Sequence, residues 1–173
     1  MNTSFLTAIL MNSLLLFDFS TSSDWSVWEI ENDVVMGGKS SSNLARSEEG
    51  NAVFTGDVSL ENDGGFASMQ YHFKPQDIKG YNKACIRLKG DGKPYQFRIK
   101  ANLNEKASYI HTFKTSGEWQ TIEIPLNEMQ PSYRGEKMDQ PNFNAHKIQE
   151  IRFLIGNGKA ENFQLEIDKI ELQ

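Results

Sequence analysis

Short runs in which every second residue is apolar are the feature that most constrains the fold of this chain. Residues 84–89 read Ala-Cys-Ile-Arg-Leu-Lys, and residues 95–100 read Tyr-Gln-Phe-Arg-Ile-Lys. A period of two puts apolar side chains on one face of a β-strand, whereas an amphipathic helix needs a period near 3.6. The pattern therefore predicts antiparallel strands with one buried face and one wet face.

The same kind of run recurs along the chain, and turn residues separate the runs. We expect further strands at residues 53–60, 69–73, 109–113, 119–124, 148–155 and 163–172. Many short strands with turn signals between them are typical of a β-sandwich or barrel. We therefore predict an all-β fold in which residues 14–173 form one β-sandwich domain and residues 1–13 form an N-terminal extension.

Local signals add three details. Asp91-Gly92 lies between two alternating runs and favours a tight hairpin, because both turn positions need positive φ. The apolar parity slips near Asp168-Lys169, which indicates a β-bulge. Residues 126–145 contain two prolines and show no clear period, so we expect a long loop with one helical turn at residues 126–129.

Composition excludes one class of partner. The 173 residues carry a net charge of −5, and the 18 Lys and Arg are scattered. No basic run is long enough to follow a phosphate backbone, so we exclude nucleic acid. The single cysteine, Cys85, lies in an apolar run and is predicted to be a buried core residue. A chain this poor in cysteine fits the cytoplasm, which is the location we expect.

The apolar stretch from Phe5 to Phe17 has two interpretations. It is too short and too polar for a membrane span, so we expect none. It resembles the h-region of a signal peptide, which would make the protein exported, but no Lys or Arg precedes it. We favour the alternative that residues 14–19 form the first strand. The N-terminus contains no arginine, so we also expect no mitochondrial transit peptide.

The sequence contains no motif for catalysis or for a metal centre. None of the three histidines, His72, His111 and His146, lies in a metal-binding spacing, and no Gly-x-Ser-x-Gly elbow occurs. Residues 61–64 read Glu-Asn-Asp-Gly but lack the calcium-loop pattern. We therefore expect no catalytic residue, no metal and no cofactor. A structural calcium held mainly by backbone carbonyls stays open, because it would leave little trace in the sequence.

Two segments with adjacent glycines carry the most distinctive pattern. Residues 32–42 contain Asp33, then Gly37-Gly38, then several serines; residues 63–68 contain Gly64-Gly65 just before a strand. Paired glycines permit turns that other residues cannot adopt. Asp33 is placed so that its carboxylate can pin the first turn.

These segments resemble the complex I intermediate-associated protein 30 family. The family's opening motif is similar to a pattern of Trp28, Asp33, Met36, Gly37, Gly38, Ser40 and Ser42, and its second motif is similar to Gly64, Gly65, Phe66, Ala67 and Ser68. Weaker matches follow in the family's order, so the likeness covers residues 14–172. The chain departs from the pattern at Gln70, where arginine is usual, and at Lys39, where an apolar residue is common.

The resemblance implies a jelly-roll β-sandwich of the galactose-binding-domain-like class. It also implies a role in assembling respiratory complex I, as in mitochondrial members of the family. That role is chaperone-like and not catalytic. The chain looks like a bacterial-type, single-domain member, and fold alone does not transfer a function.

Two functions of the binding class stay open. The first is a non-catalytic assembly factor or chaperone for complex I or another protein complex, with a protein partner held by loop residues. The candidate binding residues are Trp28, Asp33, Met36, Gly37, Gly38, Ser40, Ser42, Gly64, Gly65, Phe66, Tyr133 and Arg134. The alternative is a carbohydrate-binding module, whose glycan would be held by Tyr109, His111, Trp119, Arg98 and Asn102.

Overall fold

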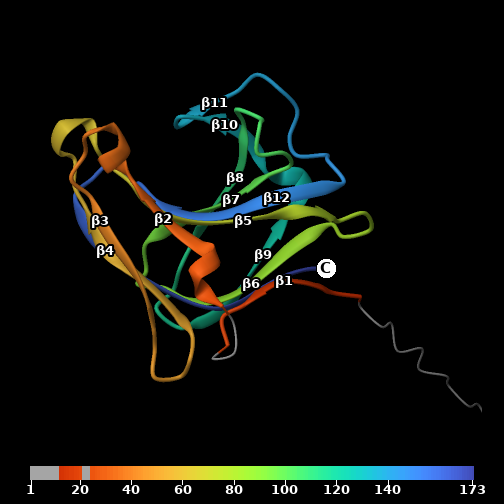
Figure 1. Ribbon diagram of the computed structural model, residues 1–173, viewed down its shortest axis with the longest axis horizontal. Helices are drawn as coiled ribbons and strands as arrows, with labels where there is room; N and C mark the ends of the chain where they lie inside the picture. Colours follow the sequence, from red (N-terminus) through yellow and green to blue (C-terminus); the bar gives the residue numbers. More distant parts are fainter. Residues whose placement is uncertain (1–11, 21–23) are drawn as a thin grey trace, which may run out of the picture.

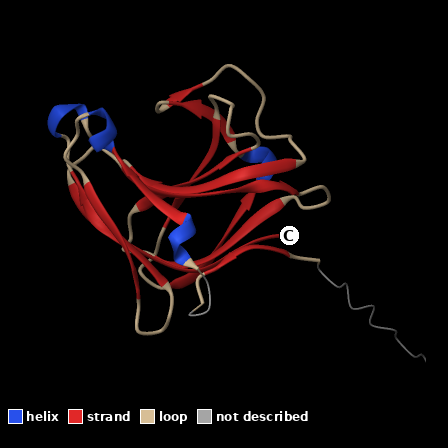
Figure 2. Cartoon of the chain, in the orientation of Figure 1, coloured by secondary structure: helices blue, strands red, loops and turns tan. Residues whose placement is uncertain are grey.

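Two antiparallel β-sheets stack face to face in the computed structural model, which describes residues 12–20 and 24–173 (Figures 1 and 2). Within those residues one sheet has six strands, in the order β3 (Ser41–Arg46), β4 (Ala52–Val58), β13 (Glu161–Leu172), β6 (Lys83–Lys89) and β9 (Trp119–Pro125), with β1 (Leu14–Asp18) pairing with the end of β13. The other has seven, in the order β11 (Glu136–Lys137), β10 (Gln130–Tyr133), β8 (Ser108–Lys114), β7 (Pro94–Lys100), β12 (Lys147–Ile155), β5 (Ala67–Asp77) and β2 (Trp28–Asn32). Single 3-10 turns complete the described part: η1 (Trp25–Val27), η2 (Asp33–Met36), η3 (Glu61–Asp63) and η4 (Leu126–Glu128).

The alternating runs fill the space between the sheets, as predicted. Tyr95, Phe97 and Ile99 of β7 are each at most 1% exposed, and their neighbours in sequence face outward. Cys85 is buried as well. Burial raises the pKa of its thiol, so the side chain stays protonated and unreactive at neutral pH.

An aromatic cluster closes the core beside β1. The Trp28 ring centroid lies 5.1 Å from that of Phe19, 5.4 Å from that of Phe17 and 5.7 Å from that of Tyr71. The predicted first strand is confirmed as β1, which brings Phe17 into this cluster. The predicted bulge is also confirmed, because the pairing of β13 with β6 slips between Ile167 and Lys169.

The hairpin predicted at Asp91-Gly92 is wrong. β6 and β7, on either side of the turn, belong to different sheets. The Asp91 carboxylate accepts hydrogen bonds from the Tyr95 hydroxyl at 3.0 Å and from the Gln164 amide at 3.0 Å, and this ties the turn to β13. Gly92 does have positive φ. The dipeptide therefore specifies the backbone of the turn, but it does not decide which sheet the next strand joins.

The long loop predicted over residues 126–145 is wrong in part. The helical turn is present as η4, but β10 and β11 form a small hairpin within the segment. Arg134 and Gly135 make its two-residue tip, with φ of +51° and +84°, as a tight hairpin turn requires. These strands are too short to show an alternating pattern, and Pro131 within β10 lowers the signal further.

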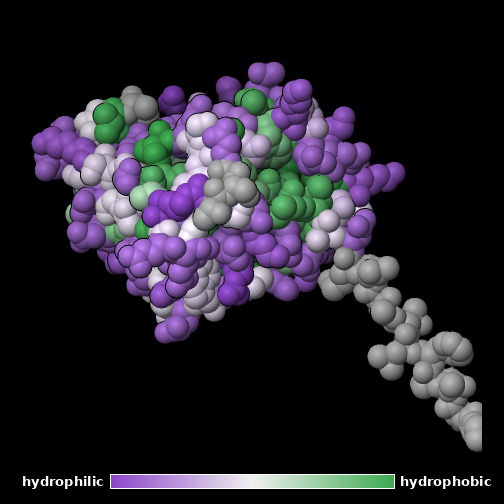
Figure 3. Space-filling model, turned by 60° about the horizontal axis from the view of Figure 1, so that its bottom comes forward, coloured by the Kyte–Doolittle hydropathy of each residue, from purple (hydrophilic) through white to green (hydrophobic). Residues whose placement is uncertain are grey.

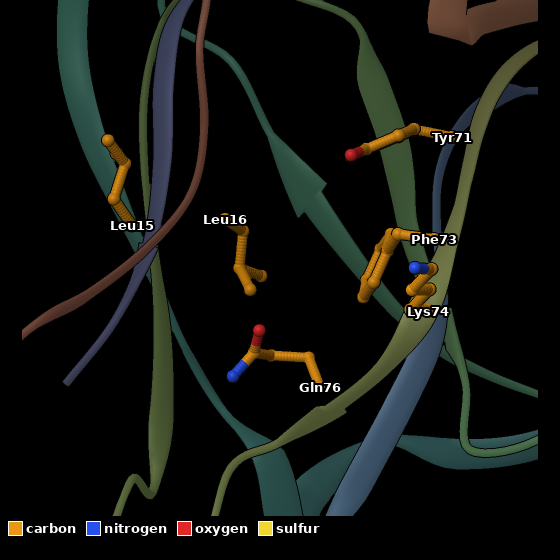
Figure 4. Close-up of a pocket in the computed structure, with 6 residues that line it drawn as sticks. All are labelled: Leu15, Leu16, Tyr71, Phe73, Lys74 and Gln76. Atoms are coloured by element: carbon orange, nitrogen blue, oxygen red, sulfur yellow. The ribbon is translucent and has the colours of Figure 1, made fainter.

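One side of the sandwich opens between β1 and β5. A pocket of about 320 Å³ lies there, lined by Leu15, Leu16, Tyr71, Phe73, Lys74 and Gln76. Leu16 and Gln76 project into the space from opposite sheets, and Phe73 lies on the β5 side (Figure 4). A space-filling view shows apolar surface near the start of the described chain (Figure 3). Apolar side chains from both sheets are therefore partly accessible at this edge.

We expect Trp28→Ala to lower the free energy of unfolding by about 3–5 kcal/mol, since it empties the centre of the aromatic cluster. Urea unfolding measured by circular dichroism checks the value. The matched control is Trp119→Ala on the outward face of β9, where Arg87 lies over the ring, and about 1 kcal/mol or less is expected there. Equal losses for the two variants would contradict the central place of Trp28.

Candidate functional site

The Asp33 side chain joins the two glycine-rich segments at one end of the seven-stranded sheet. Its Oδ1 accepts a hydrogen bond from the Ser40 amide at 2.9 Å, and its Oδ2 accepts from the Gly65 amide at 2.6 Å and the Phe66 amide at 3.2 Å. The Ser40 hydroxyl donates to Oδ2 as well. Asp33 is 1% exposed. One buried carboxylate therefore fixes two loops that lie about thirty residues apart in the sequence.

Each glycine pair serves this junction in two ways. A Cβ on Gly38 would lie 2.3 Å from Asp33 Oδ1, and a Cβ on Gly64 would lie 2.6 Å from Oδ2, so no side chain fits at either position. The partners Gly37 and Gly65 have φ of +93° and +142°, a region that favours glycine. The sequence pattern anticipates the turns, but the reason for Gly38 and Gly64 is the close approach of Asp33.

Burial raises the pKa of the Asp33 carboxyl, but hydrogen bonds from the Ser40 hydroxyl and from the Gly65, Ser40 and Phe66 amides outweigh it, and the net pKa lies below its usual value. Four donors of the described chain converge on this carboxylate, one on Oδ1 and three on Oδ2. Asp33 is therefore charged at neutral pH, and its carboxylate is buried among donors of its own chain. The arrangement supports a structural role for this carboxylate.

The other predicted residues are divided between the core and two rims. Trp28 lies in the core and Met36 ends η2, while the Ser42 hydroxyl donates to Asn32 Oδ1 at 2.8 Å. Tyr133 and Arg134 lie at the tip of the β10–β11 hairpin, where the Tyr133 side chain is 39% exposed. In Figure 1 the hairpin and the η2 and η3 turns are both at the top of the view, with the seven-stranded sheet between them. The prediction that these residues contact a partner stays a prediction.

Between the two rims lies the outer face, which we define as the side of the seven-stranded sheet that points away from the six-stranded one. The register places on it Glu29, Glu31, Ser68, Gln70, His72, Glu150, Arg152, Leu154, Gln96, Arg98, Lys100, Ile110, Thr112, Gln130 and Ser132. The sheet bends so that β10 and β11 rise beside this face (Figure 1). Several of its polar side chains are buried, including Glu150 at 2% exposure.

Arg152 is the centre of a hydrogen-bonded network on the outer face. Its Nε donates to Glu150 Oε1 at 3.3 Å, and its Nη2 donates to Glu31 Oε2 at 3.3 Å and to Gln70 Oε1. The second oxygen of Glu150 lies 2.8 Å from Nε2 of His72. The buried Glu150 is thus paired on both oxygens, which is the condition for keeping a charge out of water.

Arg98 is the second arginine of this face and is placed differently. It lies directly opposite Arg152 on the neighbouring strand β7. Its Nε and Nη2 both donate to the neutral Gln96 Oε1, at 2.9 and 2.6 Å. Burial and the nearby Arg152 charge lower the pKa of Arg98 to about 10, although Glu150 opposes this. Arg98 therefore stays charged at neutral pH, and no carboxylate of the described chain forms an ion pair with its guanidinium.

Sequence reasoning missed the network, and of the two arginines on the outer face it named only Arg98, as a glycan contact. The polar parity of β5, β7 and β12 was readable, but which strands are neighbours was not. The predicted glycan group is also dispersed. Tyr109 and His111 share the inward side of β8 with Phe113, and Trp119 lies on the six-stranded sheet. Asn102 lies in the loop after β7.

Metal and membrane features are absent from the described part of the chain. Within residues 12–20 and 24–173, no three His, Cys, Asp or Glu side chains gather as a metal site would need. No helix in those residues is long and apolar enough to cross a bilayer.

The fold is a jelly-roll β-sandwich of the galactose-binding-like class. A family 11 carbohydrate-binding module from a cellulosomal cellulase of Clostridium thermocellum superposes with a TM-score of 0.71 and 19% identity, covering 93% of this chain and 94% of the module. A mutant of a family 29 carbohydrate-binding module superposes with a TM-score of 0.57 and 10% identity, covering 94% and 91%. At these identities the likeness concerns the fold alone.

Sequence comparison defines the family. Residues 17–167 match the family model of complex I intermediate-associated protein 30, and the chain belongs to this family. Relatives named probable complex I intermediate-associated protein 30, mitochondrial, are 28% identical in Caenorhabditis briggsae and 27% in Caenorhabditis elegans, each over 89% of this chain. The matched region is 52% of each relative, so the chain spans about half the length of the curated relatives it matches. The resemblance inferred from the glycine-rich motifs is thereby confirmed.

We expect Asp33→Asn to lower the free energy of unfolding by about 2 kcal/mol or more, because an amide nitrogen would face backbone donors inside the junction. The native pKa of Asp33 is lowered, so its contribution is complete above the usual value of 3.8 and is lost as the pH falls through the native pKa. Stability of the unmutated chain should therefore fall more steeply below about pH 4 than that of the variant. Urea unfolding at about five pH values between pH 2 and pH 7 measures the loss of stability and its pH dependence.

The matched control for this prediction is Asp63→Asn, at an exposed carboxylate in the adjoining η3 turn. It should leave the free energy of unfolding at pH 7 within about 0.5 kcal/mol. Parallel pH profiles for Asp33→Asn and the unmutated chain would show that other carboxylates control the acid transition.

Proposed function

We propose that this chain is a non-catalytic protein-binding module that assists the assembly of respiratory complex I or of another protein complex, and that the outer face is its docking surface. Membership of the family and the names of the relatives support the assembly role. The observation that carries the choice of surface is the charged, internally hydrogen-bonded network centred on Arg152.

The network suits recognition of a folded protein surface. Its side chains are held by one another and by the sheet, so little side-chain entropy is lost when a partner binds. Charged groups in fixed positions favour one partner orientation and penalise wrong partners. The exposed Tyr133 and Arg134 at the hairpin tip belong to the residue types that dominate binding energy in interfaces.

A carbohydrate-binding module is the second candidate, and the fold likeness favours it. One solved neighbour is a family 11 module in complex with a β-1,3-1,4-mixed-linked tetrasaccharide, with a TM-score of 0.69 and 19% identity. The side chains argue against it, because the outer-face positions of the described strands carry no Trp, Tyr or Phe. A sugar ring therefore has no aromatic platform there to stack against.

The remaining features of the proposal concern location and cofactors. We propose a cytoplasmic location, with export as the alternative if residues 1–13 act as a signal. We propose that the module works without a cofactor or metal. Both proposals rest on the sequence.

Photo-crosslinking from two matched threonines tests the docking surface. A photoreactive phenylalanine replaces either Thr112, exposed on the outer face, or Thr121, exposed on the outward side of β9. In the native host we expect adducts with subunits of complex I, or of one other defined complex, from position 112 only. Equal adducts from both positions, or none, would refute the docking surface.

The same preparations test the glycan alternative by affinity electrophoresis in gels containing mixed-linked β-1,3-1,4-glucan. We expect migration identical to that in a gel without polysaccharide. Retardation by the glucan, together with absent protein adducts, would replace the proposal with the carbohydrate-binding function.

The hairpin tip gives a further prediction. Arg134 has positive φ, and asparagine tolerates that backbone, so Arg134→Asn should leave the free energy of unfolding within about 0.5 kcal/mol. If the hairpin borders the docking surface, the adduct yield from position 112 should fall severalfold in this variant. An unchanged yield would remove the hairpin from the surface.

A further inference from the structure

The outer face is divided by charge between its two halves. Its carboxylates lie on β2 and β12, at Glu29, Glu31 and Glu150. The outward positions of β7 carry Arg98 and Lys100. On β12 the register sets Glu150 opposite Lys100 and Arg152 opposite Arg98, and it places no carboxylate beside either β7 residue on β8 or β10. A chain with a net charge of −5 thus presents a locally basic half-face.

The two arginines that meet at the boundary differ in their partners. Arg152 contacts the carboxylates of Glu150 and Glu31. Arg98 makes no ion pair within residues 12–20 and 24–173, and both of its described hydrogen bonds go to the neutral Gln96. A guanidinium has five donors, so three N–H groups of Arg98 have no described acceptor.

The unmatched charge is held in a partly buried position. Arg98 is only partly exposed, and Arg152 lies directly across from it. Burial and repulsion by Arg152 both work against its positive charge, and the attraction of the nearby Glu150 does not outweigh them. A carboxylate arriving from outside would compensate this charge and would find free donors in the fork geometry that guanidinium offers.

We propose that Arg98 receives a carboxylate side chain from an acidic segment of the protein partner, bound across β7 and β8. This proposal rests on the proposed function and names the chemistry of its partner. Ile110 lies opposite Arg98 on β8 and offers an apolar contact for the methylenes of a glutamate. Lys100, on the same strand and opposite Glu150, places an ammonium group at the end of β7 beside the site.

An acidic peptide fits this half-face better than an acidic glycan does. The outward positions here are filled by guanidinium, ammonium, hydroxyl, amide and aliphatic groups, without a ring to stack against a sugar. An extended peptide, by contrast, needs one fixed charge partner and small apolar contacts for its alternate side chains.

The test uses a peptide of three glutamates, acetylated and amidated at its ends, titrated into the full chain and followed by NMR of the arginine Nε–Hε signals. We expect a saturable shift of the Arg98 signal, and binding at least about tenfold weaker in Arg98→Gln. The control Arg87→Gln changes an arginine of the six-stranded sheet that already pairs with Asp168, and it should bind as the unmutated chain does. A tri-glutamine peptide should cause no shift.

Several outcomes would overturn the proposal. No binding of tri-glutamate, or equal binding by Arg98→Gln, would remove Arg98 as the carboxylate site. Binding of tri-galacturonate with no binding of tri-glutamate would assign the carboxylate to a glycan. Urea unfolding of Arg98→Gln checks that the variant is folded. If it is not, Arg98→Lys replaces it and should bind the peptide several times more weakly than the unmutated chain, because lysine keeps the charge but lacks the paired N–H donors of the guanidinium.

Crosslinking from position 112 separates this proposal from the proposed function. If Arg98→Gln keeps the full adduct yield, the docking surface is retained and the carboxylate site at Arg98 is rejected. If the unmutated chain gives no adducts while tri-glutamate binds at Arg98, the carboxylate site stands and the assigned docking role falls.

Discussion

The buried Asp33 carboxylate is the constraint on which the geometry of one rim depends. A charge with 1% exposure persists only if donors surround it, and the donors here come from η2's own loop and from the segment before β5. Because the carboxylate must approach both loops closely, Gly38 and Gly64 have no room for a side chain. Two glycine-rich motifs that are separate in the sequence are therefore parts of one junction, which fixes the end of β2 against β5 and so the edge of the outer face.

The outer face depends on a second buried carboxylate, that of Glu150, and on the groups that pair with it. Glu150 is paired with both Arg152 and His72, and Gln70 accepts a hydrogen bond from Arg152. The family resemblance leads us to expect arginine where this chain has Gln70, and the register shows what an arginine would meet at that position. Gln70 lies directly opposite Arg152, so an arginine there would bring a third guanidinium into the row that already holds Arg152 and Arg98. A neutral acceptor at position 70 avoids that repulsion.

Local pattern predicted much of this fold and only part of the site. Alternation identified the buried side chains of β7, and the motif around Asp33 predicted that its carboxylate holds the turn. Both signals are local, because each lies within a few consecutive residues. The change of sheet after Asp91 was missed, since a turn dipeptide carries no information on which distant strand comes next. The placement of Arg98 opposite Arg152 was missed for the same reason: it exists only because β7 and β12 pair across more than fifty residues of sequence.

The likeness to carbohydrate-binding modules shows how one sandwich supports different chemistry. The strands that carry the outer face are set by the core, whose residues point the other way, so the outward positions are free to vary without disturbing the fold. In this chain they carry paired charges rather than aromatic rings. A guanidinium such as Arg98, partly buried without an ion pair in the described chain, carries a desolvation cost that a neutral ring would not. Its presence on the surface is easiest to understand if the compensating charge belongs to another molecule, which makes the charge balance of this face a property of the complex.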